Sequence, residues 1–212
     1  MLLGAFMDAR EKSFGLDLGA GTGVLSLMVA QKNPEIQIDA IEINHEASNE
    51  CDYNFYNSPW ENRLISIEGD YLKLNFERKY DLIFSNPPYH LEDVLGDNLN
   101  ATRAKHSSSN ELKELIDLAS NLISNSGDFW LILPYQLADF VIEIANKSHF
   151  HCHQIIRIHS KESKRNTRVI LRFSKEIKQL FERDFFIRNE DNSYTLDYIE
   201  LTKDFHFKKL SD

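Results

Sequence analysis

The chain has 212 residues, which is enough for one domain with a sizeable hydrophobic core. Its formal net charge of −9 argues against a tight nonspecific nucleic-acid binder, and no apolar run approaches the length of a membrane span. The two cysteines, Cys51 and Cys152, lie far apart, so we expect free thiols in a reducing cytoplasm and a protein that works without a membrane.

The first predicted unit is a strand, a glycine turn and a helix. Residues 14–18 read as a short buried strand, Gly19, Gly21 and Gly23 form the turn, and residues 24–32 form a helix that ends at Asn33-Pro34. Such a unit begins a doubly wound α/β sheet that holds a nucleotide over the strand's carboxyl end. The dinucleotide fingerprint fails here because its sixth position, counted from the first glycine, is Val24.

Two further strands are predicted to end on acidic residues. Residues 36–43 carry Glu42 at their end, about twenty residues past the glycines, where a carboxylate can accept both hydroxyls of a ribose. Both S-adenosylmethionine and NAD carry such a ribose, so Glu42 does not separate the two cofactors. Residues 64–68 are followed by Gly69-Asp70, which is also an ordinary turn pair.

The apolar run 80–85 leads into Asn86-Pro87-Pro88-Tyr89, and this motif suits a flat NH2 group. Pro88 pushes the residue before it toward extended geometry, so the Pro87 carbonyl can project into a pocket. The Asn86 side chain adds a second acceptor and Tyr89 an aromatic face. Two acceptors and a stacking plane fit the exocyclic amine of adenine, although a proline pair after a strand is also typical of a rigid turn.

The second half of the chain continues the strand and helix alternation. We expect an active-site loop over 90–107, a capping box at 108–111, a helix over 112–123 and a strand over 129–133 stopped by Pro134. A helix over 137–147, strands near 152–159 and 168–173, and a small hairpin from 185–188 and 194–196 complete the prediction.

Basic residues gather in two places. Arg103 and Lys105 follow the Asn-Pro-Pro-Tyr motif, which favours contact with a substrate phosphate. Arg165 and Arg168 lie between two late strands, where a solvated loop is an equally good interpretation. The run His149–His153 suggests a metal site, but no second ligand group with suitable spacing is evident, and we expect no bound metal.

The Asp-x-Gly-x-Gly-x-Gly pattern at 17–23 resembles motif I of S-adenosylmethionine-dependent methyltransferases. With Asn-Pro-Pro-Tyr, it makes the chain look like a class I N6-adenine methyltransferase. More narrowly, the chain resembles the bacterial tRNA1(Val) (adenine(37)-N6)-methyltransferase family. The segments that carry the narrower resemblance are Leu2–Ala5, Asn57–Trp60, Asn86–Tyr89, Arg103–His106 and Arg168–Leu171.

This resemblance implies one methyltransferase domain over 1–212, with an N-terminal segment of the family missing. It implies a Rossmann-like, mostly parallel seven-stranded sheet with helices on both faces and one antiparallel late strand. It also implies that the glycines approach the methionine portion of S-adenosylmethionine, that Asp17 faces the ammonium of that cofactor, and that Asp70 binds its adenine amine. Asn86 is expected to contact the cofactor as well as the substrate amine.

The expected activity is methyl transfer to N6 of an adenine in tRNA, and the resemblance implies adenosine 37. The protein is expected to be a monomer. Asn86 and Pro87 would accept the two N–H bonds of the amine, and Tyr89 would stack on the extruded base. Three alternatives remain: methylation of a glutamine on a protein factor, N6-adenine methylation of DNA or ribosomal RNA, and a catalytically inactive RNA-binding or scaffold protein of the same fold.

Overall fold

The computed structural model describes residues 1–88 and 99–206, with only the main chain of residues 99–109. Eight strands form one sheet in the order β3-β2-β1-β4-β5-β7-β6-β8. The strands are β1 (Phe14–Leu18), β2 (Gln37–Glu42), β3 (Leu64–Glu68), β4 (Tyr80–Ser85), β5 (Ile123–Pro134), β6 (His151–His159), β7 (Arg168–Ser174) and β8 (Phe181–Phe186). Adjacent pairs are parallel except at β7, which runs antiparallel to both β5 and β6.

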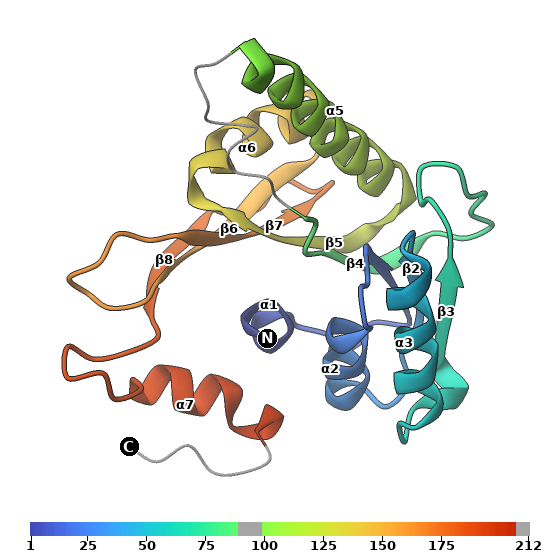
Figure 1. The fold of residues 1–212 in the computed structure, drawn as a ribbon, viewed down its shortest axis with the longest axis horizontal. Coiled ribbons are helices and arrows are strands. Elements are labelled where there is room, and N and C mark those ends of the chain that lie inside the picture. Colours follow the sequence, from blue (N-terminus) through green and yellow to red (C-terminus); the bar gives the residue numbers. More distant parts are fainter. Residues whose placement is uncertain (89–98, 207–212) are drawn as a thin grey trace.

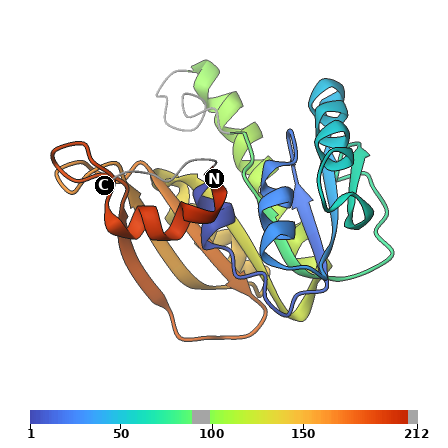
Figure 2. The same cartoon turned by 90° about the horizontal axis from the view of Figure 1, so that it is seen from below.

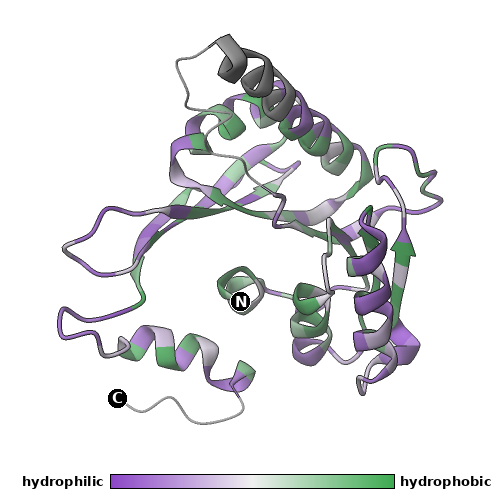
Figure 3. Ribbon diagram, viewed as in Figure 1, coloured by the Kyte–Doolittle hydropathy of each residue, from purple (hydrophilic) through white to green (hydrophobic). Residues whose placement is uncertain are grey.

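Helices cover both faces of this sheet (Figure 1). The helices are α1 (Leu2–Phe6), α2 (Val24–Lys32), α3 (His45–Tyr56), α5 (Leu99–Leu122), α6 (Ala138–Lys147) and α7 (Leu196–Thr202), with short 3-10 turns η1 (Glu61–Arg63), η2 (Tyr135–Leu137) and η3 (Lys203–Phe205). Because each central strand is covered on both sides, its residues are nearly continuously apolar (Figure 3). The predicted α/β class is confirmed, with an antiparallel late strand.

The two faces of the sheet bury separate hydrophobic clusters. One joins α5 and α6 to the sheet through side chains such as Ile116, Val141 and Phe129. The other joins α1, α2, α3 and α7 through side chains such as Leu3 and Phe55. Seen from below the first view, α1 lies between the sheet and α7 (Figure 2). This layering leaves the ends of the strands accessible at the edges of the sheet.

Three predictions of local structure were wrong. The helix predicted from 112 begins as early as Leu99, so the sequence 108–111 lies inside α5 and caps nothing, and the loop predicted over 90–107 is helical from Leu99. Alanine, arginine and lysine between 101 and 105 are strong helix formers, and they outweigh the weak capping signature.

The third error concerns the C-terminal hairpin and raises the number of strands from seven to eight. Phe181–Phe186 forms β8, parallel to β6. The predicted hairpin is present in a shorter form, because Arg188 and Tyr194 form an isolated antiparallel bridge and the Thr195 N–H donates to the Ile187 carbonyl at 3.1 Å. Leu196 begins α7, because the Thr195 hydroxyl accepts a hydrogen bond from the Tyr198 main-chain N–H at 3.1 Å and caps that helix.

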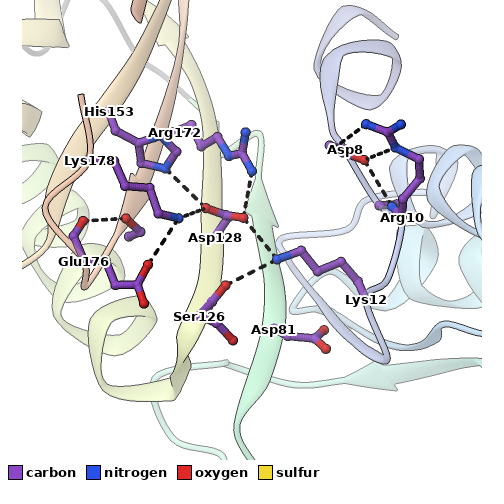
Figure 4. Close-up of polar contacts among 12 residues, drawn as sticks. Asp8, Arg10, Lys12, Asp81, Ser126, Asp128, His153, Arg172, Glu176 and Lys178 are labelled. Atoms are coloured by element: carbon purple, nitrogen blue, oxygen red, sulfur yellow. Dashed lines mark hydrogen bonds and ion pairs between the residues drawn. The ribbon is translucent and has the colours of Figure 1, made fainter. Parts of the chain in front are cut away.

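The amino end of β5 carries a buried carboxylate surrounded by cations (Figure 4). One oxygen of Asp128 accepts from Lys12 at 3.0 Å and from Arg172 at 2.8 Å. The other oxygen contacts His153 at 3.2 Å and Lys178 at 3.4 Å. Asp128 therefore ties the segment before β1 to β5, β6, β7 and the loop after β7, at the edge of the sheet opposite the carboxyl ends.

No helix among the residues that the structure describes is long and apolar enough to cross a membrane. Within the same ranges, no group of three or more His, Cys, Asp and Glu side chains could hold a metal ion. His149 has a φ of 52° and precedes β6, so it lies outside the strand that carries His151 and His153.

Candidate active site

The glycine turn lies at the carboxyl ends of β1 and β2 and opens toward a cavity. The main-chain N–H groups of Gly19 and Ala20 both donate to the Ile41 carbonyl, at 2.9 Å and 3.0 Å. Gly19 and Gly21 have φ angles of 75° and 56°, and a Cβ placed on either would meet no atom within 4 Å. The turn is therefore fixed from behind by β2 and leaves its front open for a ligand.

Glu42, at the end of β2, supports the same turn from the side. Its Oε2 accepts a hydrogen bond from the Gly21 main-chain N–H at 2.8 Å, and its Oε1 accepts one from the Asn44 N–H at 2.8 Å. A carboxylate has about four acceptor positions, so two remain for the hydroxyls of a ribose. Glu42 can hold the turn and a ligand at the same time.

The Asn-Pro-Pro segment faces the glycine turn from the end of β4. The buried Ser85 hydroxyl donates to the Leu18 carbonyl at 2.6 Å and ties the ends of β4 and β1 together. Asn86, Pro87 and Pro88 follow directly, with Asn86 exposed and Pro87 half-buried. Because β4 lies next to β1 in the sheet, the Asn86 side chain and the Pro87 carbonyl lie on the same side of the fold as the glycine turn.

One cavity of about 850 Å³ joins these parts. This volume lies within the range of about 300–1,000 Å³ that is usual for cofactor and small-molecule sites. The lining residues are Gly19, Gly21, Glu42, Ile43, Ala47, Asp70, Tyr71, Leu72, Asn86, Pro87, Pro88, Glu111, Leu112, Leu115, Pro134, Leu137 and Arg168. The open glycine turn, the carboxylate beside it and the mixed apolar wall fit a nucleoside cofactor such as S-adenosylmethionine.

Seven of the predicted site residues line this cavity: Gly19, Gly21, Glu42, Asp70, Asn86, Pro87 and Arg168. Asp70 is held in place by two contacts, since it accepts from the Leu72 N–H at 3.0 Å and pairs with Lys73 at 2.7 Å. These contacts keep the pKa of the Asp70 carboxyl below its ordinary value, with the Lys73 hydrogen bond as the main cause. The carboxylate is thus ionised and available as an acceptor at the cavity wall.

Asp17 is not among the residues that line the cavity, and its expected contact with the ammonium of the cofactor stays a prediction. Its side chain is fully buried, and its Oδ2 accepts from the Ser26 hydroxyl at 2.8 Å on the first turns of α2. Burial raises the pKa of Asp17 to about 7, against the lowering effect of the Ser26 hydrogen bonds. Asp17 therefore anchors α2 behind the glycine turn.

Gly23, the third glycine of the turn, lies close against α3. A Cβ at this position would lie 2.6 Å from the Phe55 ring and 2.7 Å from Cys51 Sγ, and its φ is 80°. The glycine is needed for the close approach of the turn to α3, on the side away from the cavity. Of the three turn glycines, only Gly19 and Gly21 line the cavity.

The remaining predicted residues are placed as follows. Arg165 is exposed in the loop between β6 and β7 and does not line the cavity. Tyr89 lies outside the residues that the structure describes, and so do the side chains of Arg103 and Lys105.

Sequence reasoning missed the apolar part of the cavity wall. Ile43 directly follows Glu42, and Tyr71 and Leu72 directly follow Asp70 as a pair, so their position after a strand end was an available signal. Leu112 and Leu115 were predicted as part of an apolar helix face, and that face continues from the core into the cavity.

The chain resembles known methyltransferases over nearly its full length. A family model described as "Methyltransferase small domain" matches residues 1–156. A tRNA1(Val) (adenine(37)-N6)-methyltransferase from Aliivibrio fischeri is 36% identical, over 97% of this chain and 88% of that relative. One of the same description from Flavobacterium psychrophilum is 35% identical, over 98% of this chain and 90% of the relative.

Solved structures show the same fold at lower sequence identity. A predicted O-methyltransferase from Agrobacterium tumefaciens superposes with a TM-score of 0.73 at 18% identity, over 95% of this chain and 94% of that one. The CcbJ methyltransferase from Streptomyces caelestis superposes with a TM-score of 0.60 at 12% identity, over 82% of this chain and 94% of that one.

Proposed function

The chain belongs to the family of tRNA1(Val) (adenine(37)-N6)-methyltransferases, and we propose that it transfers a methyl group from S-adenosylmethionine to N6 of adenosine 37 in that tRNA, in the cytoplasm. The observation that carries this proposal is the single cavity that joins the glycine turn and Glu42 to Asn86 and Pro87. A cofactor site and an acceptor site for an amine share one space there.

The cofactor site consists of the glycine turn and two carboxylates. Gly19 and Gly21 let the main chain approach the methionine portion, Glu42 accepts the ribose hydroxyls, and Asp70 accepts the adenine amine. When bound, S-adenosylmethionine supplies an electrophilic methyl group on a sulfonium centre. The side chains of Ile43 and Leu72 add apolar surface next to these polar contacts.

The acceptor site makes the substrate amine a better nucleophile. The lone pair of adenine N6 is spread into the ring, so the nitrogen is a weak nucleophile. The Asn86 side-chain oxygen and the Pro87 carbonyl each accept one N–H, which directs the lone pair toward the methyl group. The proton leaves after the methyl has arrived, so alignment and fixed dipoles supply the catalysis without a strong base.

The substrate must enter this site as an unstacked base. An adenine stacked in an anticodon loop cannot reach Asn86 until it is extruded, and Tyr89, next to Pro88 in the chain, is the proposed stacking partner. Arg165 and Arg168, with Arg103 and Lys105, are the proposed phosphate contacts. Because the chain is acidic overall, we expect weak binding of tRNA and steep loss of activity with salt.

The test is a methyl-transfer assay with labelled S-adenosylmethionine and four separate acceptors: tRNA, ribosomal RNA, DNA and a release-factor peptide. We expect label on tRNA alone. Asn86→Ala should lower kcat by about 100-fold or more. Asn75→Ala, an exposed asparagine in the loop before β4, is the matched control and should be fully active. Label on peptide or DNA, or full activity of Asn86→Ala, would refute the proposal.

A further inference from the structure

Tyr135 directly follows β5, next to the cavity but not among the residues that line it. It stands between Pro134 and Leu137, which both line the cavity, and its side chain is 40% exposed. Its main-chain N–H donates to the Thr167 carbonyl at 3.2 Å, so the turn that carries it is joined to the loop between β6 and β7. An exposed tyrosine is thereby fixed beside the proposed acceptor site.

The side chain of Tyr135 interacts with one member of a charged pair. Arg157 of β6 interacts with the Tyr135 side chain and forms an ion pair with Glu182 of β8, and the hydrogen bond with Glu182 is the main reason that the pKa of Arg157 is raised. Glu182 thus orients Arg157, and Arg157 orients Tyr135. An aromatic side chain held in this way loses little conformational entropy when a base stacks on it.

Arg168 lies next to this turn and is exposed. It is paired in register with Pro134 and lines the cavity. Among the residues that the structure describes, its guanidinium has no ion pair or hydrogen bond, whereas Arg157, Arg172 and Arg188 each have a polar partner. A cation at the cavity rim without a protein partner is suited to a negatively charged substrate.

The loop that carries Arg168 is itself anchored. The Lys161 ammonium donates to the Glu190 carbonyl at 3.0 Å, and the Ser163 N–H donates to the Glu190 carboxylate at 2.9 Å. The loop between β6 and β7 and the loop after β8 therefore lie side by side, as both views show (Figure 1 and Figure 2). Their contacts use Lys161 and leave Arg168 available.

We propose that Tyr135 and Arg168 form a binding subsite for the nucleotide adjacent to the methylated adenosine, in which the Tyr135 ring stacks on the neighbouring base and Arg168 pairs with the phosphate between the two nucleotides. This inference rests on the proposed function and extends it to a second nucleotide of the RNA. Stacking on a tyrosine tolerates any base, and the phosphate contact carries no sequence information. The subsite therefore keeps the RNA strand in place after the target base has left the stack.

The first test measures KM and kcat for tRNA1(Val). Tyr135→Ala should raise KM about 10-fold with kcat within about 2-fold of wild type, because stacking is present before and during the reaction. Tyr135→Phe keeps the ring and should stay within about 2-fold on both parameters. Tyr53→Ala removes an exposed tyrosine on α3, away from the cavity, and should change neither.

Arg168 is tested by the salt dependence of the same KM. Arg168→Gln should reduce the slope of log affinity against log salt by about 0.7, the value for one phosphate contact on a single strand. Lys175→Gln removes an exposed cation just beyond the opposite end of the same strand and should leave the slope unchanged. An unaltered slope in Arg168→Gln would overturn its assignment.

The decisive test replaces each neighbour of adenosine 37 in turn by an abasic nucleotide. At one of the two positions, the loss of the base should raise the wild-type KM about 10-fold and have no further effect in Tyr135→Ala. If the KM increase caused by the abasic nucleotide and the KM increase caused by Tyr135→Ala multiply at both positions, Tyr135 does not stack on a neighbouring base. Methylation of intact tRNA by the wild-type protein is the reference, and its absence would refute the proposed function instead of the subsite.

Discussion

The carboxylate of Glu42 accepts a hydrogen bond from the main-chain N–H of Gly21 at 2.8 Å, across the mouth of the cavity. The end of one strand thereby fixes the turn that follows its neighbour. Because the same carboxylate borders the cavity, the shape of the glycine turn and the affinity for the cofactor depend on one side chain.

Glu42→Ala should therefore weaken cofactor binding by about 100-fold, since it removes the ribose acceptor and releases the turn. Glu42→Gln keeps one acceptor oxygen but places an NH2 group against a main-chain N–H, and we expect about a 10-fold loss. Calorimetric titration with S-adenosylmethionine measures both. Glu46→Gln, on the exposed first turn of α3, is the control, and equal affinities for Glu42→Ala and the control would contradict the role of Glu42.

Alanine substitutions at two glycines of the same turn should affect different properties, namely cofactor affinity at Gly21 and stability at Gly23. Alanine at either position is strained by about 1–2 kcal/mol because φ is positive. At Gly21 the added methyl enters open space in the cavity, so Gly21→Ala should lower cofactor affinity about 10-fold with little further loss of stability. At Gly23 the methyl meets Phe55 and Cys51, and Gly23→Ala should cost about 3 kcal/mol of unfolding free energy in total.

Denaturant unfolding and cofactor titration of both variants separate the two outcomes. A Gly23→Ala protein as stable as Gly21→Ala would show that α3 moves to accommodate the added methyl group without loss of unfolding free energy.

The sequence predicted the strand ends more accurately than the directions of their side chains. Glu42 and Asn86 could be placed because parallel strands bring their carboxyl ends to one edge of the sheet. Asp17 could not, because β1 is covered on both faces and shows no alternation that reveals which face a residue occupies. Its contact with Ser26 depends on how α2 packs, which is a tertiary property.

Gly23 and β8 show the same limit. A glycine in a turn signals either a positive φ or a close approach, but only the position of α3 shows what approaches Gly23. In β8, three consecutive charged residues between phenylalanines suit an edge strand, but its partner β6 lies more than twenty residues earlier in the chain. The tight pairing of β6 and β7 could be predicted because the two strands are joined by one short loop.

The buried Asp17 should make stability depend on pH. Burial raises its pKa from 3.8 to about 7, so the native state keeps a proton that the unfolded chain releases between these values. The unfolding free energy therefore falls as pH rises from 4 to 7 and levels off above 7. Asp17→Asn should remove this slope and gain stability relative to wild type at pH 8, by up to about 4 kcal/mol.

Chemical unfolding of both proteins at pH 5 and pH 8 measures the difference. Ser26→Ala is the companion variant, because loss of its hydrogen bond should raise the pKa of Asp17 further and extend the fall in unfolding free energy to higher pH. Parallel pH profiles for wild type and Asp17→Asn would show that this carboxyl does not titrate in the expected range.

The opposite dependence is expected for Asp128. Burial alone would raise its pKa, but hydrogen bonds from His153 and Arg172, with the charges of Arg172 and Lys12, hold the pKa well below its ordinary value. A depressed carboxyl pKa contributes stability above the unfolded value of 3.8, and this contribution is lost as pH falls below it.

Asp128→Asn should cost about 3 kcal/mol at pH 7, because it leaves three buried or half-buried cations without their counter-charge. The difference from wild type should shrink between pH 4 and pH 2, because the carboxyl of the unfolded wild-type chain takes up a proton there while the native carboxyl stays ionised. Lys178→Gln removes the most exposed of these partners, at 34% side-chain exposure, and should cost less than about 1 kcal/mol. Since Asp128 lies at the edge of the sheet away from the cavity, cofactor affinity of folded Asp128→Asn should equal that of wild type. A change in cofactor affinity without loss of stability would contradict a purely structural role for this carboxylate.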